Sequence, residues 1–263
     1  MRSAMVGMAV GALLLGGCAS GKGSDSSGVA QAPESAGLSA LAAPSKPPGN
    51  GIADLEPAGI VGKAKAALAE AKSFRFGGIV HSVATTSTHK YLGTTSSFDF
   101  KVRGSDLLGT LTIDAGTVEL LRVGKKEYIR PDEAFWTADT GSAVLAKRVM
   151  AVLKGRWVLV PSKIKDFEDL FRVASTDKLL DPTRTYVKGG VQTIDGKQAI
   201  AITDSGSDPR TLFVAVEGAP YPLRWDGGIQ LGGTLSFSDF GADFTDLKAP
   251  RAAKVVDLRQ LAG

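Results

Sequence analysis

Apolar residues recur along this chain at two spacings, one typical of helices and one typical of strands. Within residues 54–72, Ile60 and Leu68 belong to an apolar series at helical spacing, and most of the charged residues fall on other sides of the helix. Residues 142–153 repeat this pattern, and residues 166–171 form a shorter helical piece. We therefore expect amphipathic helices that each turn one narrow face toward a core.

Most of the remaining folded part alternates apolar and polar residues, which is the two-residue period of a half-buried strand. Short breaks at 104–105 and 124–125, and the pair Asp195 and Gly196, have the length of hairpin turns. The expected strands are residues 74–80, 98–103, 107–113, 118–123, 127–130, 157–160, 185–194, 199–203, 212–216, 221–225 and 229–237. Strands joined by such turns pair in antiparallel fashion.

The order of the elements predicts the fold class. Strands, then helices, then strands again within one chain are typical of an α+β fold. We expect a curved antiparallel sheet with the helices packed on its concave face, because long sheets curl and an antiparallel sheet can have one covered face. Residues 52–263 are expected to form this single domain.

The amino-terminal segment has a different character. Arg2 precedes an apolar run over residues 5–15, which is too short to cross a bilayer but has the length of a signal-peptide core. The following Gly16 and Gly17 lead to Cys18, the only cysteine of the chain, and this word resembles a bacterial lipobox. The resemblance implies that residues 1–17 are a lipoprotein signal peptide, and that Cys18 receives diacylglycerol and a further acyl chain such as palmitate. An ordinary secretory signal with an incidental cysteine is the alternative.

Residues 18–51 are expected to be a disordered tether behind the lipidated cysteine. Gly, Ser, Ala and Pro supply 24 of the 33 residues from 19 to 51, so the segment cannot bury enough apolar area to offset its ordering entropy. A flexible coil of this length reaches roughly 30 Å. We therefore expect a domain held near the extracytoplasmic face of the cell membrane.

Charge and candidate chemistry narrow the function classes. The formal net charge is only +4, with both signs interspersed, which does not favour a nucleic-acid partner. His81 and His89 lack a third ligand at metal-site spacing, and Asp204 with Asp208 suggests a surface turn more than a calcium loop. Known nucleophile, zinc and phosphate motifs are missing from the sequence. We expect no catalytic residue, no metal and no cofactor, hence no enzyme.

Several short segments of the sequence resemble those of a known family. "AKSFRFGG", "LKGRWVLVP", "DGKQAIAI" and "GAPYPLRW" followed by "GGTLSFSDFG" resemble actinobacterial cell-envelope lipoproteins of the LolA-like superfamily, including lipid carriers of the LppX and LprG type. The resemblance covers about residues 52–245. It implies a half-open β-barrel closed by helices around an apolar cavity that holds the acyl chains of a lipid or glycolipid.

The residues that would line such a cavity are apolar and occur at strand spacing: Phe74, Phe76, Val80, Phe98, Phe100, Leu111, Ile113, Leu235 and Phe237. Small residues in the same strands are expected to leave volume opposite them: Gly77, Gly78, Gly109, Gly232 and Gly233. Two functions stay open at this point. The protein either binds or carries lipid or another long apolar molecule, or it is a structural or regulatory envelope lipoprotein with a packed core that contacts another protein.

Overall fold

The computed structural model describes residues 49–82, 95–161, 165–172, 180–228, 231–257 and 259. All of these residues fall in one compact unit that spans residues 46–263. The expected signal peptide, Cys18 and nearly all of the tether lie outside the described residues, as does His89. Gly49, which precedes the expected domain start at residue 52, forms a bridge with Glu217.

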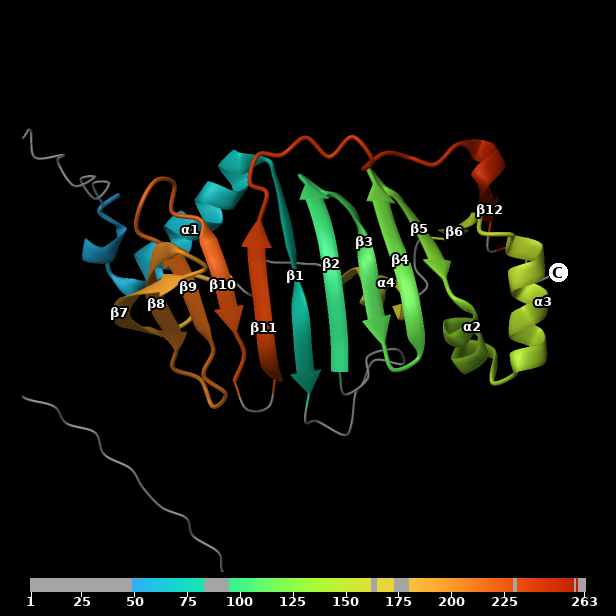
Figure 1. Ribbon diagram of the computed structural model, residues 1–263, viewed down its shortest axis with the longest axis horizontal. Helices are drawn as coiled ribbons and strands as arrows, with labels where there is room; N and C mark the ends of the chain where they lie inside the picture. Colours follow the sequence, from blue (N-terminus) through green and yellow to red (C-terminus); the bar gives the residue numbers. More distant parts are fainter. Residues whose placement is uncertain are drawn as a thin grey trace, which may run out of the picture. The chain divides into compact units, whose positions relative to one another are not determined.

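A single open sheet organises the described residues, within which twelve strands pair in the order β12-β6-β5-β4-β3-β2-β1-β11-β10-β9-β8-β7 (Figure 1). The strands are β1 (Ser73–Ser82), β2 (Thr95–Arg103), β3 (Asp106–Ile113), β4 (Gly116–Val123), β5 (Lys126–Pro131), β6 (Trp157–Val160), β7 (Tyr186–Ile194), β8 (Lys197–Asp204), β9 (Thr211–Ala215), β10 (Pro222–Asp226), β11 (Leu231–Ser238) and β12 (Val255–Asp257). The edge strands β12 and β7 do not pair with each other, so the sheet is not closed into a barrel.

The strand register gathers large apolar side chains on one face of the sheet. Phe76 of β1 lies opposite Phe100 of β2 and Phe237 of β11, and Phe98 of β2 lies opposite Leu111 of β3. Because side chains alternate between the two faces, residues that lie directly opposite each other share a face. The expected curved, mostly antiparallel sheet with helices is confirmed, and the expected turn at Asp195 joins β7 to β8.

Helix α1 (Pro57–Ala71) forms where the helical spacing predicts it. Pro57 stands in its first turn, where the missing N–H costs little. The helix buries Ile60, Val61 and Leu68, and it contacts β1 and β7 to β10. In Figure 1 the teal helix α1 passes behind β9 and β10, so it covers one part of the sheet.

The remaining helices are α2 (Glu133–Thr140), α3 (Ala143–Leu153) and α4 (Lys165–Arg172), with the short 3-10 turns η1 (Ile52–Asp54) and η2 (Ala252–Lys254). Helices α3 and α4 agree with the predicted residues 142–153 and 166–171, whereas α2 was not predicted. Phe135 and Trp136 of α2 are buried, and the helix contacts β4. The pattern also did not predict β12, which pairs in parallel with β6 nearly a hundred residues earlier in the sequence.

Two apolar clusters stabilise this arrangement. The larger cluster joins the aromatic face of the sheet to side chains of all four helices, α1 to α4. The smaller cluster contains Ala199, Ala201 and Phe213, which alternate with Ile200 and Leu212 of the larger cluster and therefore occupy the other face of β8 and β9. These two strands are thus buried on both faces, while β1, β2 and β11 turn mostly polar side chains outward.

Candidate functional site

The nine residues expected to line a cavity come together in the larger cluster. Eight are buried, and Val80 is partly buried against them. The rings pack directly on one another: Phe76 lies 5.7 Å from Phe100 and 5.9 Å from Phe237 between ring centroids, and Phe98 lies 5.9 Å from Phe100. This aromatic group therefore forms a packed core around Phe76 and Phe100, which are 1% and 0% exposed.

The expectation that glycines leave volume opposite the aromatic rings is wrong. A Cβ atom on Gly109 would lie 2.1 Å from the carbonyl oxygen of Asp99, and one on Gly233 would lie 2.1 Å from that of Ile79. Gly233 also has a φ of +107°, which side-chain-bearing residues rarely adopt. Backbone oxygens also lie close to the Cβ positions of Gly77 and Gly78. The contact at Gly232 is looser, with the nearest oxygen 3.2 Å from the Cβ position. These positions have no side chain because neighbouring backbone fills the space.

Open apolar space lies instead beside α1. A cleft of about 330 Å³ occupies the angle between the carboxyl-terminal end of α1, the start of β1 and the turn after β2. Leu68, Phe74 and Leu180 are 6%, 7% and 1% exposed and form its inner wall, whereas Lys65 and Lys72 are exposed and stand toward solvent. The complete lining is Lys65, Leu68, Ala69, Lys72, Phe74, Gly104 and Leu180.

The local sequence explains how the cleft is built. Lys65, Leu68 and Ala69 stand at positions i, i+3 and i+4, so they form one stripe along α1, and Lys72 follows directly after the helix. The helix ends directly before Lys72, whose backbone turns with a φ of 63° and donates its N–H to the Ala69 oxygen at 3.2 Å. The Lys72 oxygen accepts from the Gly104 N–H at 3.0 Å, which fixes the β2–β3 turn at the cleft.

Sequence reasoning found one residue of this cleft and missed the others. Phe74 was among the nine candidates, but Lys65, Lys72 and Leu180 were not singled out. The helical stripe that contains Lys65 was a usable signal, because it carries apolar and cationic residues on one side. Leu180 offers no comparable signal, since its contact with the cleft arises only from the tertiary fold. An apolar wall below two cations suits a molecule with an apolar tail and an anionic head.

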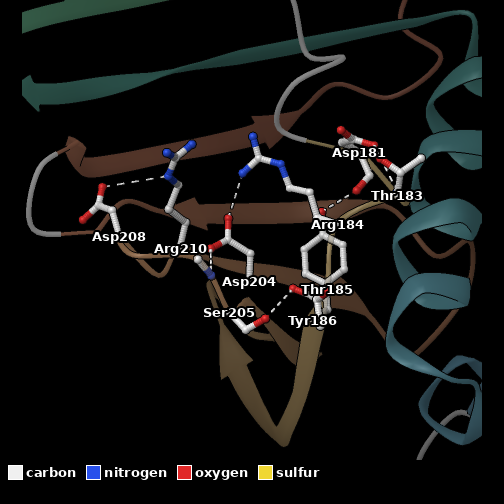
Figure 2. A network of polar contacts seen from close by, with 10 residues as sticks. Asp181, Thr183, Arg184, Thr185, Tyr186, Asp204, Ser205, Asp208 and Arg210 are labelled. Atoms are coloured by element: carbon white, nitrogen blue, oxygen red, sulfur yellow. Dashed lines mark hydrogen bonds and ion pairs between the residues drawn. The ribbon is translucent and has the colours of Figure 1, made fainter.

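A group of polar residues, separate from the cleft, connects the start of β7 to the end of β8 (Figure 2). Arg184 donates from Nη1 to Oδ2 of Asp204 at 3.0 Å, and Gly206 donates its N–H to Oδ1 at 3.4 Å. The Tyr186 hydroxyl donates to the backbone oxygen of Asp181 at 2.6 Å. Burial raises the pKa of Tyr186, so this hydroxyl stays protonated and remains a donor.

This polar group has the geometry of a structural clamp. Asp204 and Asp208 are 7% and 8% exposed, and Oδ2 of Asp208 lies 4.0 Å from Nε of Arg210. The space enclosed between Arg184, Arg210 and Trp225 is about 10 Å³, enough for about one water molecule. Residues 205–207 are exposed and form a bend between β8 and β9, as expected of a surface turn. The two aspartates that flank this turn are buried, and their carboxylates are set against two guanidinium groups.

Other candidate sites from the sequence have simple surroundings. The His81 ring nitrogen Nδ1 lies 3.1 Å from the hydroxyl of Thr95, a contact between neighbouring strands. Among the residues that the structure describes, no group of three or more His, Cys, Asp or Glu side chains could hold a metal ion. Over the same residues, no helix combines the length and the apolar character needed to cross a membrane.

Neither a known family model nor a curated protein sequence matches this chain. Among solved structures, it is similar to the lipoprotein LppX of Mycobacterium tuberculosis, with 14% identity and a TM-score of 0.47 over 72% of this chain and 97% of LppX. LprF from Mycobacterium bovis is similar with 14% identity and a TM-score of 0.45 over 74% of this chain and 97% of LprF. The LolA superfamily protein NE2245 from Nitrosomonas europaea is similar with 10% identity and a TM-score of 0.24, over 73% of this chain and 96% of that protein. At these values the likeness is limited to the general course of the chain.

Proposed function

We propose that the protein is an extracytoplasmic, non-catalytic lipoprotein that binds the acyl chain of an anionic amphiphile in the cleft beside α1. The observation that carries this proposal is the arrangement of the cleft, in which Leu68, Phe74 and Leu180 form an apolar wall and Lys65 and Lys72 stand at the solvent side. The wall would contact the chain, and the lysines would attract a carboxylate or phosphate head. The ligand class is therefore a lipid or glycolipid with a negatively charged head.

The size of the cleft supports a small ligand or one chain of a larger lipid. Its volume of about 330 Å³ lies near the lower end of the range for ligand pockets, which is roughly 300–1,000 Å³. Each methylene group that leaves water contributes about 0.8 kcal/mol, from which the cost of immobilising the chain is subtracted. The two exposed lysines add a smaller and salt-sensitive attraction, of about 0.2–1 kcal/mol for each ion pair.

The amino-terminal segment supplies the proposed membrane attachment. Cys18 would carry the acyl chains, and the tether behind it would hold the domain within roughly 30 Å of the membrane surface. A ligand taken from or delivered to that membrane would then travel only a short distance. Metabolic labelling with a radioactive fatty acid tests the anchor, because the Cys18→Ser variant should incorporate no label.

A packed lipoprotein that acts by contact with another envelope protein is the second candidate. The direct packing of Phe76, Phe98, Phe100 and Phe237 favours it, because these four rings contact one another where the sequence predicted a ligand. In that case the cleft beside α1 would be an incidental surface feature. The two functions differ in one measurable property, which is the affinity of the cleft for acyl chains.

Substitution at the cleft tests the proposal. Ala69 lines the cleft and is exposed, so Ala69→Phe should fill part of the space without disturbing the core. We expect the Kd for a fluorescent fatty acid to rise at least about tenfold, which corresponds to about 1.4 kcal/mol. Ala66→Phe is the matched control, because Ala66 is also exposed on α1 but does not line the cleft. Equal affinities for the two variants, or no binding by the wild type, would contradict the proposal.

The charge of the ligand head is tested by a second pair of variants. Lys65→Gln should weaken binding of a fatty acid by up to about fivefold, the size of one exposed ion pair, and should leave binding of the corresponding fatty alcohol unchanged. Lys63→Gln is the control, because Lys63 is an exposed residue of α1 outside the cleft. An equal loss for the acid and the alcohol would show that the lysine does not recognise a negative head.

A further inference from the structure

Helix α3 carries an apolar surface that no described part of the chain covers. Val144, Leu145 and Val152 are 63%, 45% and 50% exposed, whereas Ala146 and Leu153 are buried. On a helix of this length the exposed aliphatic residues lie on the side away from the buried ones. A surface helix normally turns charged and polar residues to solvent, so three exposed aliphatic side chains on two turns indicate a contact surface.

Basic residues accompany these side chains, and α3 itself contains no acidic residue. Arg148 is exposed and lies four residues after Val144 and four before Val152, on the same side of the helix. Lys147 is also exposed and lies at the edge of this side, three residues after Val144. We call the set Val144, Leu145, Lys147, Arg148 and Val152 the α3 surface.

An open hollow of about 570 Å³ continues the α3 surface at the carboxyl-terminal end of the helix. Its lining includes Val152, Lys154, Arg156 and Lys254. The Arg156 guanidinium donates to the backbone oxygens of Val152 at 2.6 Å and Leu153 at 3.0 Å, so it is engaged in ending the helix. Within the described residues, no ion pair involves Lys147, Arg148, Lys154 or Lys254.

We propose that the α3 surface and the adjoining hollow dock on an anionic lipid bilayer. The aliphatic side chains would enter the interface between headgroups and acyl chains, and the lysines and Arg148 would lie among phosphate groups. Charge complementarity favours a bilayer with anionic headgroups, because the surface combines exposed apolar side chains with positively charged ones. The helix lies at the β12 end of the sheet, far along the strand order from β7 (Figure 1).

The docking would act together with the proposed anchor and not in place of it. A helix of 11 residues with three exposed aliphatic side chains binds a bilayer weakly by itself. A lipidated Cys18 would raise the effective concentration of α3 at the membrane, so that weak docking is sufficient to orient the domain. The inference uses the proposed anchoring only for this effect, and it does not depend on ligand binding in the cleft.

A fluorophore on α3 tests the proposal in the full chain. The double variant Cys18→Ser, Val152→Cys has one thiol, which is labelled with an environment-sensitive dye. Because this variant lacks the anchor, vesicles are titrated to a large excess, at which weak docking is measurable. We expect a blue shift of the emission with vesicles of phosphatidylcholine and phosphatidylglycerol, and a much smaller shift with phosphatidylcholine alone. The control is Cys18→Ser, Val187→Cys, because Val187 is 60% exposed on β7 at the other edge of the sheet; this label should show no shift.

Charge removal completes the test. In the labelled chain, Lys147→Gln should lower the apparent vesicle affinity about fivefold, the effect of about 1 kcal/mol for one basic residue near an anionic surface. Lys197→Gln, an exposed lysine of β8, should leave the affinity unchanged. The proposal is overturned by equal shifts at positions 152 and 187, by no shift at position 152, or by a shift without vesicles that grows with protein concentration, which would indicate self-association. Equal affinities for the two lysine variants would also overturn it.

Discussion

Gly109 in the middle of β3 has no room for a side chain, because β2 lies against it. Its Cα lies against the backbone of β2, where a Cβ would meet the Asp99 oxygen at 2.1 Å and the Phe100 ring at 2.4 Å. The missing side chain lets the Phe100 ring lie over the neighbouring strand, next to Phe76. This glycine therefore leaves space for the Phe100 ring in the core. The need for a glycine arises from the contact between two strands and not from the local sequence.

Substitution of Gly109 measures that contact. Gly109→Ala should lower the free energy of unfolding by about 1–3 kcal/mol or more, because the added methyl group overpacks the core and pushes on the backbone. Gly190→Ala in β7 is the control, since nothing lies within 4 Å of its Cβ position; it should be neutral or stabilise by about 0.4–1 kcal/mol. Denaturant melts of both variants provide the measurement. A stable Gly109→Ala protein would show that the core has the spare volume that the structure denies.

At the scale of elements, Asp132 joins a helix to the sheet. Its Oδ1 accepts from the Phe135 N–H at 2.8 Å and so caps α2, while its Oδ2 accepts from the Thr117 N–H of β4 at 2.9 Å. One carboxylate therefore sets the start of α2 and its position on β4. The buried Phe135 and Trp136 then pack on the sheet.

Removal of this carboxylate should destabilise the domain more than loss of an ordinary cap. Asp132→Ala should cost about 2 kcal/mol or more, because it removes a helix cap worth about 1 kcal/mol and leaves a second N–H without its acceptor. Ser142→Ala is the comparison, because Ser142 caps α3 through one bond of 3.3 Å to the Leu145 N–H; it should cost about 0.5–1 kcal/mol. Thermal melts that place the two variants at the same stability would refute the double role of Asp132.

Some helices and strands could be predicted from the sequence, and others could not. The alternation around Phe98 and Phe100 predicted β2 correctly, and the spacing of Ile60 and Leu68 predicted α1. Helix α2 was missed because it has only two turns and follows β5 after one residue, so its buried Phe135 and Trp136 do not complete a helical period. Pairing of β12 with β6 was missed because three residues carry no periodic signal, and their partner is distant in sequence.

At the scale of the whole molecule, the apolar positions were easier to predict than the space between them. The sequence identified the residues of the aromatic core, but it could not distinguish a packed core from a lined cavity, because both place the same side chains on the same face. Glycines such as Gly109 were interpreted as vacant volume, although strand packing fills it. The cleft lies beside α1. Its presence depends on how one stripe of this helix is oriented against Phe74 and Leu180.

The proposed parts of the molecule have separate tasks at this scale. Cys18 and the tether would keep the domain at the membrane, the α3 surface would orient it, and the cleft beside α1 would hold an acyl chain. Because the tasks lie on different elements, a variant of one should leave the others unchanged. The acyl-chain site is the central claim, since the other two would equally serve a lipoprotein that only contacts proteins.

Mass spectrometry of organic-solvent extracts from the purified full-length protein tests this claim most directly. A lipid attached covalently at Cys18, as proposed, would stay on the chain during extraction, so the extract would report only bound molecules. We predict that an amphiphile with an acyl chain and an anionic head is extracted from the wild type and from Ala66→Phe, and that it is strongly depleted in Ala69→Phe. Extracts that contain no such molecule, or that contain equal amounts for all three proteins, would contradict the proposed site.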